Sequence, residues 1–294
     1  MDYKKIIKNQ ELRINILRFT KIIPDKIMIK IQYKIATGRN LNLKRPQRFT
    51  EKLQWYKLYY RDNLMTKCAD KYAVREYIEK KGYKDILIPI LGVYDNANEI
   101  NFDKLPNKFV MKTTNGSHTN LFCENKSKLN KEHAKDKLNK WLNRDTISPG
   151  REWAYHGIKP KIICEEYLEK DNNNDLIDYK FFCFNGKVYC LYVIIERFLK
   201  SGIKLGIYDR DFKKLNCRRE DISPIEKEIY KPKNYEKMLR IAEDLAKDFP
   251  HVRVDLYNID GKILFGELTF YDGSGYKGFI PDKFDYELGK QFKI

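Results

Sequence analysis

The segment HVRVDLYNIDGKILFGELTF, residues 251–270, decides the fold that this sequence predicts. Apolar and polar side chains alternate on both sides of Asp260-Gly261, and this pattern predicts two antiparallel strands, 251–258 and 262–270, joined by a short turn. One face of this hairpin is therefore expected to be apolar and buried. The other face is expected to carry four polar side chains, those of Arg253, Asp255, Glu267 and Thr269.

The length of the turn decides whether the two carboxylates share the polar face. A two-residue turn at Asp260-Gly261 would direct Glu267 toward the apolar face. A three-residue turn, 259–261, would instead pair Arg253 with Glu267 and keep Asp255 on the same face. We therefore predict the three-residue turn, with its glycine in the left-handed conformation that such a turn requires.

Two carboxylates beside an arginine are suited to holding a hard cation next to phosphate. Mg²⁺ takes one or two carboxylates and completes its shell with water and phosphate oxygens. An exposed strand face crossed by an Arg253–Glu267 ion pair, which contributes only a few tenths of a kcal/mol, would give the same pattern. The hairpin by itself leaves both interpretations open.

Upstream of the hairpin, helical and strand-like patterns are mixed along the chain. Helices are predicted from near residue 50, over 69–77 with a stop at Gly82, around 134–142, and after an N-cap at Asn234. Strands are predicted over 109–112, 121–123, 162–165, 178–184 and 187–195. The last two flank Asn185-Gly186, a strong hairpin signal. Several antiparallel hairpins among helices predict an α+β fold and disfavour a doubly wound parallel sheet.

Composition and charge limit the class of protein. The chain has 294 residues, and its 58 Lys and Arg against 41 Asp and Glu give a net charge of +17, which attracts polyanions. We find no apolar run near the roughly 20 residues of a membrane-spanning helix and no signal-peptide region, so we expect a cytoplasmic protein. The six cysteines form no Cys-x-x-Cys pair, which argues against a zinc site.

Residues 1–40 are basic and also contain many apolar side chains. Their irregular spacing predicts a helical extension that packs on the body of the protein. A helix lying on the anionic inner face of a membrane is the alternative.

Six motifs, in this order, give the chain a resemblance to a known family. They are FTEKLQW (49–55), ADKYAVR (69–75), EEYL (165–168), DYKFFCFNGK (178–187), FPHVRVDLY (249–257) and GELTF (266–270). Over roughly residues 40–294 the chain resembles the TupA-like branch of the ATP-grasp superfamily. The resemblance implies an ATP-grasp-like fold of two α+β lobes whose antiparallel sheets clamp a nucleotide. It divides the chain into a helical extension (1–65), a lobe with a glycine-containing phosphate loop (66–170) and a C-terminal lobe with a metal-binding hairpin (171–294).

The resemblance also implies ATP and Mg²⁺ as cofactors and assigns residues to them. The implied metal ligands are Asp255, Glu267 and Thr269, where threonine replaces the asparagine of the family's usual Glu-x-Asn motif. The implied catalytic groups are Arg253, the backbone N–H of Gly273, and Lys112. The implied phosphate contacts are Lys71, Lys112, Gly116 and Ser117, and the implied adenine contacts are Glu165, Glu166 and Leu168. Asp178 is assigned to the ribose, and Lys180 and Arg197, both placed on strands, to phosphate or acceptor.

As a function, the resemblance implies a carboxylate–amine ligase that works through an acylphosphate. Its partners would be a uronic-acid-containing anionic glycan, or the precursor of one, and an amino acid or amine. A glycan kinase and a polysaccharide-biosynthesis glycosyltransferase, which would need a nucleotide-sugar site, are the alternatives. A non-enzymatic polyanion binder is a further alternative, but the basic residues are dispersed and no nucleic-acid module is present, so we expect no nucleic-acid partner.

Overall fold

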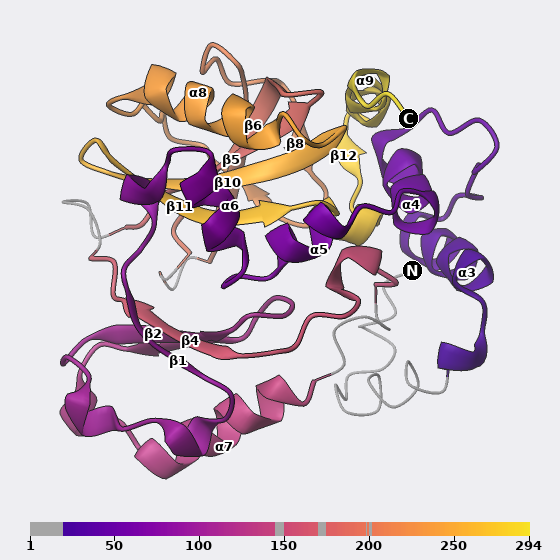
Figure 1. Cartoon of the computed structure of the whole chain (residues 1–294). Helices are drawn as coiled ribbons and strands as arrows, with labels where there is room; N and C mark the ends of the chain where they lie inside the picture. The colour runs from indigo at the N-terminus through magenta and orange to yellow at the C-terminus, as the bar shows by residue number, and fades with distance from the viewer. Residues whose placement is uncertain (1–19, 145–149, 170–174, 198, 200–201) are drawn as a thin grey trace. The chain divides into compact units, whose positions relative to one another are not determined.

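The computed structural model of this chain describes residues 20–144, 150–169, 175–197, 199 and 202–294. These residues divide into two compact units (Figure 1). Unit 1 contains the described residues up to 61, between 147 and 153, and from 171 onward. Unit 2 contains those from 62 to 146 and from 154 to 170. Both units combine helices with largely antiparallel sheets, so the predicted α+β class is confirmed.

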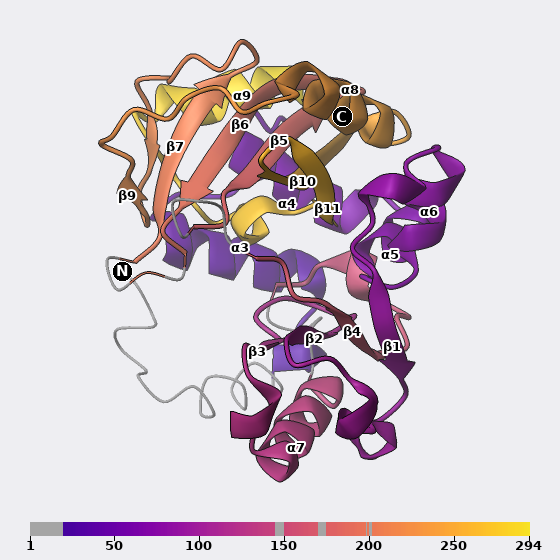
Figure 2. The same ribbon diagram turned by 90° about the vertical axis from the view of Figure 1, so that its left-hand side faces the viewer.

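Unit 1 is built on a six-stranded sheet with the order β11-β10-β5-β6-β7-β9 (Figure 2). Its strands are β5 (Asp178–Phe184), β6 (Lys187–Ile195), β7 (Lys204–Asp209), β9 (Ser223–Pro224), β10 (His251–Ile259) and β11 (Lys262–Thr269). All neighbours are antiparallel except β7 and β9. A separate pair joins β8 (Arg218–Arg219) to β12 (Phe279–Ile280). The predicted turn at Asn185-Gly186 is confirmed, and both residues have positive φ.

Helix α8 (Tyr235–Ala246) covers one face of this sheet (Figure 1). Cys183 Sγ on β5 donates to the carbonyl oxygen of Ala242 at 3.7 Å. The apolar face of this helix is buried, and it includes Met238, Leu239, Ala242, Leu245 and Ala246. Asn234 occupies the predicted N-cap position of the helix, but its side chain makes no capping hydrogen bond. Its φ is +61° and its Nδ2 donates to the Gly261 carbonyl at 2.8 Å, because the side chain holds the β10–β11 turn.

Helices α4 (Phe49–Tyr59) and α9 (Lys283–Gln291) pack on the opposite face. They contact its aromatic end, where Phe182, Phe184 and His251 gather. Phe49 contacts the rings of Phe184 and His251 at centroid distances of 5.9 and 5.0 Å. Asp285 of α9 accepts the backbone N–H of Thr50 at 2.9 Å. The helix predicted from near residue 50 is thus confirmed.

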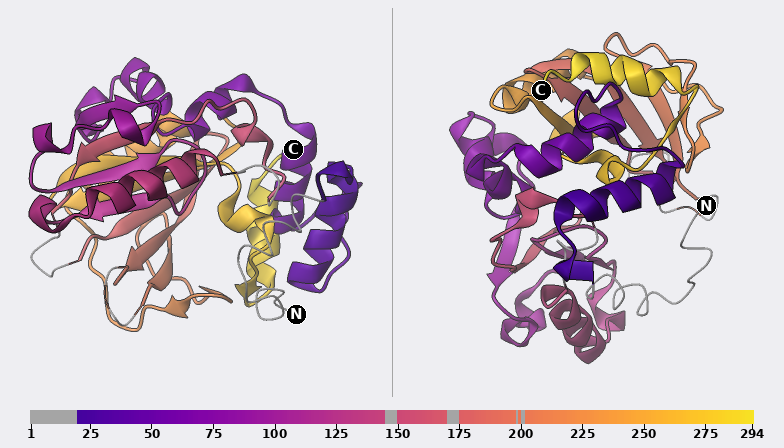
Figure 3. Two further views of the ribbon diagram at one scale, coloured as in Figure 1. Left: turned by 90° about the horizontal axis from the view of Figure 1, so that it is seen from below. Right: turned by 90° about the vertical axis from the view of Figure 1, so that its right-hand side faces the viewer.

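The described part of the N-terminal segment begins with a short 3-10 helix, η1 (Thr20–Ile22), and continues as α3 (Asp25–Thr37). Helix α3 packs beside α4 (Figure 3), and the Tyr33 hydroxyl lies 3.0 Å from Oγ1 of Thr50. The predicted packing of this segment on the body therefore holds for α3, while residues 1–19 lie outside the described residues. None of the helices among the described residues has the length and apolarity needed to cross a membrane.

Unit 2 is built on a four-stranded antiparallel sheet with the order β1-β4-β2-β3. Its strands are β1 (Ile90–Tyr94), β2 (Phe109–Thr113), β3 (Asn120–Cys123) and β4 (Ile162–Glu166). Helix α7 (Lys131–Leu142) covers one face (Figure 1), where Phe109 and Met111 pack with Ala134 and Leu138. Because side chains alternate along a strand, Lys112 lies on the other face.

The single helix predicted over 69–77 is wrong. The structure has two short helices, α5 (Asn63–Ala69) and α6 (Val74–Lys80), separated by a turn. Asp70 Oδ1 accepts the backbone N–H groups of Tyr72 and Ala73 at 2.7 and 3.0 Å. An aspartate that bonds to the backbone just after itself favours a turn over a continued helix. The other short helices are η2 (Lys84–Ile86), η3 (Ala97–Glu99), η4 (Phe102–Lys104), η5 (Lys126–Lys128), η6 (Trp153–Tyr155) and η7 (Asp272–Gly275).

The β10–β11 hairpin differs from the prediction at its turn. Ile259 pairs with Lys262, so the turn has two residues, Asp260 and Gly261, with φ values of +53° and +97°. The predicted three-residue turn is therefore wrong, and so is the predicted pairing of Arg253 with Glu267, because Arg253 pairs with Thr269. Two successive left-handed residues form the tight turn that best matches the twist of antiparallel strands.

A β-bulge at Gly266 nevertheless produces the predicted arrangement of faces. The register shifts by one residue there, so Asp255 pairs with Glu267 and Val254 pairs with Leu268. The Asp255–Glu267 pair thus lies on one face of the sheet and the Val254–Leu268 pair lies on the other. A Cβ at position 266 would lie 3.1 Å from the carbonyl oxygen of Asp255, which favours glycine at the bulge.

Candidate active site

The residues predicted for the site divide between the two units, and the structure brings together a different set in each. Unit 1 contains Asp178, Lys180, Arg197, Arg253, Asp255, Glu267, Thr269 and Gly273. Unit 2 contains Lys71, Lys112, Gly116, Ser117, Glu165, Glu166 and Leu168.

Arg253 is the central residue on the polar face of unit 1. Its Nε and Nη2 donate to the two carboxylate oxygens of Asp255 at 2.7 and 2.8 Å, and its Nη1 donates to Asp272. Nη2 also donates to Thr269 Oγ1 at 3.0 Å and lies 3.5 Å from Glu267 Oε1. One planar guanidinium therefore connects β10, β11 and the loop after β11, because it has several N–H groups in a fixed geometry.

Lys180 extends this cluster onto β5. It pairs with Asp255 in the sheet register, and its Nζ donates to the Asp255 carboxylate. Asp178 lies 3.7 Å from Lys180 Nζ and accepts a hydrogen bond from Arg197 Nη2. Arg197 follows the end of β6 at Ile195, so its predicted place on a strand is wrong. Charged contacts nevertheless join five side chains without a break: Asp178 and Lys180 on β5, Arg253 and Asp255 on β10, and Arg197 after β6.

Burial and charge act in opposite directions on this cluster. Asp255 is 1% exposed, and burial raises the pKa of its carboxyl although Arg253 and Lys180 lower it. Burial also opposes the charge of Arg253, but Asp255 and Asp272 raise the pKa of the guanidinium well above its ordinary value. Arg253 therefore remains a cation, and it contributes to the neutralisation of both of its carboxylate partners.

Asp272 and Arg219 belong to the same cluster but were not predicted. Asp272 accepts from Arg253, from Arg219 Nη1 at 3.3 Å and from the Tyr192 hydroxyl at 3.4 Å. Its position directly before Gly273 was a usable signal in the sequence. Arg219 lies in the two-residue strand β8 with no motif around it, so no comparable signal pointed to it.

The loop that contains Gly273 is held by helix α4. Gly273, Ser274 and Gly275 have φ values of +52°, +57° and +66°. Lys57 Nζ donates to the Ser274 carbonyl at 2.7 Å, and Gln54 Nε2 donates to the Gly275 carbonyl at 2.8 Å. Lys57 is fully buried, and burial lowers its pKa to about 7. Buried donors therefore fix the left-handed path of the loop, and this support was not predicted.

In unit 2, the structure brings Lys112 and Glu165 together on the sheet face opposite α7. Val110 on β2 pairs with Glu165 on β4, which places Lys112 one diagonal step from Glu165. Lys112 Nζ lies 2.5 Å from Glu165 Oε2, and the two side chains are 18% and 8% exposed. Lys112, a predicted phosphate contact, and Glu165, a predicted adenine contact, thus form one ion pair.

The loop between β2 and β3, residues 114–119, is the tip of an antiparallel hairpin and contains Gly116. Lys71 Nζ donates to the carbonyl oxygen of Gly116, and the Lys71 backbone N–H donates to the Thr114 carbonyl at 3.2 Å. The hydroxyls of Thr113 and Thr119 lie 2.8 Å apart at the base of the loop. Two predicted phosphate contacts, Lys71 and Gly116, are therefore in direct contact.

The remaining predicted residues of unit 2 lie around these contacts. Ser117 is exposed at the loop tip, and Leu168 is half-buried beyond the end of β4. Glu166 is exposed, and its backbone N–H donates to the Pro89 carbonyl at 3.0 Å. It also contributes to a surface pocket lined by Leu91, Lys104, Leu105, Pro106, Lys108, Glu166 and Tyr167.

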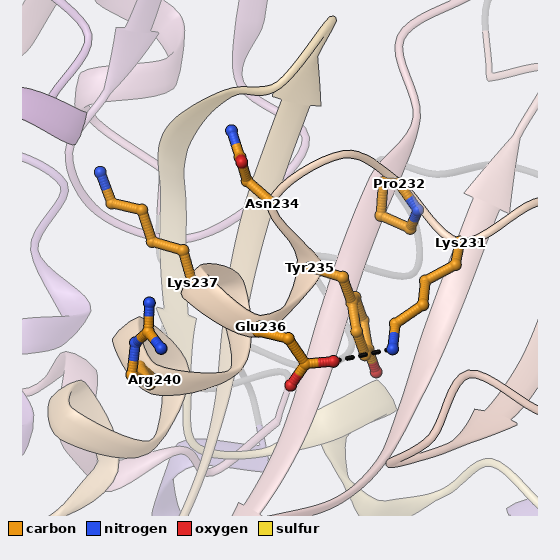
Figure 4. Close-up of a pocket in the computed structure, with 7 residues that line it drawn as sticks. All are labelled: Lys231, Pro232, Asn234, Tyr235, Glu236, Lys237 and Arg240. Atoms are coloured by element: carbon orange, nitrogen blue, oxygen red, sulfur yellow. Dashed lines mark hydrogen bonds and ion pairs between the residues drawn. The ribbon is translucent and has the colours of Figure 1, made fainter.

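A second pocket lies at the start of α8 (Figure 4). Its lining residues are Lys231, Pro232, Asn234, Tyr235, Glu236, Lys237 and Arg240, and no residue predicted for the site is among them. Lys231 Nζ and Glu236 Oε1 form an ion pair there at 2.7 Å. This pocket therefore belongs to the start of the helix and not to the candidate site.

Asp255 and Glu267 provide oxygen donors that fit a magnesium ion. They are directly opposite each other on neighbouring strands, so their carboxylates share one face. Thr269 adds a hydroxyl, which accepts from Arg253. Among the residues that the structure describes, no group of three or more Asp, Glu, His or Cys side chains is arranged for a metal. A magnesium ion at this pair would therefore take its remaining ligands from phosphate and water, as Mg²⁺ commonly does.

The segment Asp209-Arg210-Asp211 has the Asp-x-Asp spacing of a glycosyltransferase diphosphate site. Asp209 Oδ1, however, accepts the backbone N–H groups of Asp211 and Lys213 at 2.9 and 2.8 Å. Arg210 Nη2 pairs with Glu243 at 3.2 Å. The first carboxylate closes the turn after β7, which gives no support to a nucleotide-sugar site.

The sequence matches the family model described as TupA-like ATPgrasp over residues 51–293. This span includes every residue predicted for the site, and the match confirms the resemblance inferred from the motifs. Among curated proteins, no sequence matches this chain.

Several solved structures are similar to the chain at low identity. D-alanine–D-alanine ligase from Bacillus anthracis, complexed with ATP, is 16% identical with a TM-score of 0.41, and the match covers 69% of this chain and 53% of that one. L-amino acid ligase from Bacillus licheniformis is 15% identical with a TM-score of 0.43 and coverages of 92% and 57%. The ATP-grasp ligase PsnB, complexed with a phosphomimetic variant of its minimal precursor, Mg and ADP, is 13% identical with a TM-score of 0.45 and coverages of 83% and 66%. The chain thus spans between about half and two thirds of the length of these structures.

Proposed function

The chain belongs to the TupA-like ATP-grasp family, and from this premise we propose that it is an ATP- and Mg²⁺-dependent carboxylate–amine ligase. Its proposed substrates are a uronic acid of a surface polysaccharide, or of its precursor, and an amino acid or other amine. The net charge of +17 supports an anionic acceptor. We also propose that the protein works in the cytoplasm, at the inner face of the membrane, where the same charge would favour anionic lipids.

The observation that carries this proposal is the cluster around Arg253. Two carboxylates, Asp255 and Glu267, face each other on neighbouring strands, and a buried guanidinium contacts both. Such a set can hold a cation beside phosphate and at the same time direct a fixed positive charge at a reacting carbonyl.

The proposed reaction has two steps. An oxygen of the acceptor carboxylate attacks the γ-phosphorus of ATP, the bond from that phosphorus to the β–γ bridging oxygen breaks, and ADP leaves. The amine nitrogen then attacks the acyl carbon of the acylphosphate and loses a proton, and phosphate leaves with the oxygen of the broken C–O bond. Negative charge develops on oxygen in both steps, and donors that are already held in place stabilise it best.

We assign the oxyanion of the second step to Arg253 and the backbone N–H of Gly273. The bidentate contact of Arg253 with Asp255, together with its contact to Asp272, keeps the guanidinium oriented before substrate binds. Asp255, Glu267 and Thr269 would hold Mg²⁺, which when bound supplies neutralising charge to the phosphates.

The other predicted residues are proposed as nucleotide contacts. Lys71, Lys112, Gly116 and Ser117 are assigned to phosphate, Glu165, Glu166 and Leu168 to adenine, Asp178 to ribose, and Lys180 and Arg197 to phosphate or acceptor. The short distance between Lys112 and Glu165 supports a role in binding, because each could exchange this partner for a group of the nucleotide.

The test is a turnover assay of the purified full chain with ATP, Mg²⁺ and a panel of uronates and amino acids. We expect ADP and phosphate in equal amounts, and an amide product by mass spectrometry, only when both acceptor and amine are present. A phosphorylated sugar would instead identify a glycan kinase. If ATP with Mg²⁺ neither shifts the melting temperature nor is consumed, the proposed function is wrong.

Two variants connect this assay to the assigned residues. We expect Lys112→Ala and Glu267→Gln to keep the fold and to lower turnover by at least about 100-fold, the usual cost of losing one electrostatic contact to the transition state. Lys84→Ala and Glu226→Gln, which change exposed residues outside the site, are the matched controls. Full activity of both site variants would contradict the catalytic assignment.

A further inference from the structure

The outer side of α3 carries a repeat that the proposed reaction does not use. The helix sequence DKIMIKIQYKIAT contains the dipeptide Lys-Ile at 26–27, 30–31 and 34–35. Residues four apart lie on the same side of a helix, so the three pairs form one column of lysines beside one column of isoleucines. The buried side of the helix is made by other residues, Met28, Ile29 and Tyr33.

The isoleucines of this repeat are unusually exposed. Ile27, Ile31 and Ile35 are 52%, 44% and 44% exposed, and Ile22, just before the helix, is 91% exposed. These four are among only thirteen large apolar side chains that are exposed in the described part of the chain, and they fall within residues 22–35. A concentration of apolar side chains at one place on the surface marks a contact with something else.

The lysines of the repeat are exposed and uncompensated. Lys26, Lys30 and Lys34 have no ion-pair partner among the described residues. The acid of the helix, Asp25, is engaged by Arg151, whose Nη1 lies 2.7 Å from its Oδ1. The outer side of α3, which we call the Lys–Ile face (residues 26, 27, 30, 31, 34 and 35), is therefore both cationic and apolar.

We propose that the Lys–Ile face docks on an anionic lipid bilayer, with the isoleucines at the acyl boundary and the lysines at the headgroup phosphates. A bilayer surface offers both chemistries side by side, because headgroup phosphates lie directly above the acyl chains. An acidic polysaccharide would attract the lysines but offer nothing to the isoleucines, and a second copy of the face would bring lysine columns together. Docking of this face would hold the proposed ligase at the membrane surface, so the purpose of the docking rests on the proposed function.

The test is co-sedimentation of the full chain with vesicles, without ATP or substrates, so that it can fail separately from the ligase assay. We expect binding to phosphatidylcholine vesicles that contain phosphatidylglycerol, little binding to phosphatidylcholine alone, and weaker binding as salt rises. Changing Ile27, Ile31 and Ile35 together to serine should weaken binding at least about tenfold, because the apolar contact is lost. These side chains are exposed, so the melting temperature should change little.

A charge-matched pair of variants separates a specific face from a general effect of net charge. Lys26, Lys30 and Lys34 changed to glutamate should abolish binding. The same change at Lys84, Lys104 and Lys128, which are also exposed, should weaken it only slightly. Equal loss in both triple variants, or unchanged binding of the serine variant, would overturn the proposal. So would a dimer in light scattering that the serine substitutions convert to a monomer, since the face would then pair with a second copy.

Discussion

The two units hold their candidate binding groups in different ways. In unit 1, Arg253 connects carboxylates from two strands and a loop, and Lys180 adds a third strand. In unit 2, one ion pair joins Lys112 to Glu165 on a smaller sheet. The first arrangement is a buried network of several charges, and the second is a single ion pair with a buried Glu165 and a partly exposed Lys112.

This difference teaches that a charged residue can be part of a site and part of the fold at once. Asp255 is 1% exposed, so the charges around it must compensate one another inside the protein. Lys112 is partly exposed, so water can replace its partner. We therefore expect substitutions in unit 1 to lower stability as well as activity, and those in unit 2 to act mainly on activity.

The largest effect on stability is expected from Arg253→Met. The variant keeps much of the side-chain volume but leaves Asp255 and Asp272 without their shared cation. Removing one partner of a buried ionic cluster typically lowers the free energy of unfolding by about 3–5 kcal/mol. Urea denaturation measures this loss, and Arg253→Lys, which keeps the charge but not the forked geometry, should lie in between. A loss below about 1 kcal/mol would show that the cluster does not support the fold.

The next effect concerns His251, which lies in the aromatic end of the same sheet. The ring is fully buried, its Nδ1 lies 2.9 Å from the Cys183 carbonyl oxygen, and its Nε2 has no hydrogen-bond partner among the described residues. Burial lowers the pKa of His251 from its ordinary value of 6.5 to about 4. Between these values the unfolded chain binds a proton that the folded chain does not, so stability falls as the pH drops from 6.5 toward 4, by up to about 3 kcal/mol.

Denaturation of wild type and His251→Phe from pH 7 to 4 measures this contribution. The variant should lack it, so the stability difference between the two proteins should change across this range and stay constant above pH 7. The described histidines of unit 2, which are His118, His133 and His156, are exposed. Hydrogen exchange followed by peptide should therefore show that acid weakens unit 1 before unit 2. An equal loss of amide protection in both units on acidification would contradict this prediction.

A smaller effect is expected at the Lys112–Glu165 pair. Lys112 is 18% exposed while Glu165 is buried, so Lys112→Met leaves a buried carboxylate with some access to water and should lower stability by about 1–2 kcal/mol. A double-mutant cycle with Glu165→Gln isolates the coupling between the two side chains. A coupling above about 2 kcal/mol would mean that the pair is as structural as the cluster in unit 1.

The smallest effect on stability is expected from Glu267→Gln. Its side chain is 40% exposed, and its contact with Arg253 is the longest of that group at 3.5 Å. We expect a change of at most about 0.5 kcal/mol in chemical denaturation. Glu267 is therefore the position in unit 1 at which we expect turnover to fall without a matching loss of stability. A large destabilisation would place Glu267 with Asp255 as a residue that the fold needs.

The hairpin shows how far the sequence could predict this structure. Alternation along 251–270 predicted both strands and the polar face, because burial imposes a period of two on a half-buried strand. The predicted turn was wrong because a three-residue turn is needed only where the ladder is uninterrupted, and this ladder shifts register at Gly266. A signal was present, since Leu264 and Phe265 are adjacent apolar residues followed by Gly266, and a break in alternation at a glycine often marks a bulge.

The contacts that the candidate residues make could not be predicted from the motifs that singled these residues out. Motifs identified Lys112, Glu165 and Arg253, but not which carboxylate each cation would meet. Lys57 and Ser274 are far apart in the sequence, and their hydrogen bond depends on how α4 packs against a loop. Such pairings follow from the tertiary arrangement, which local patterns do not encode.

The bulge at Gly266 also makes the hairpin unequally tolerant of length variation. It contributes one residue of β11 that has no counterpart on β10. A natural or engineered deletion of one residue between the turn and the bulge could close the bulge, so that Asp255 would still meet Glu267. An insertion of one residue there would leave a second residue of β11 unpaired and would need a second irregularity in the strand. Homologues are therefore expected to shorten this hairpin by one residue more readily than to lengthen it by one.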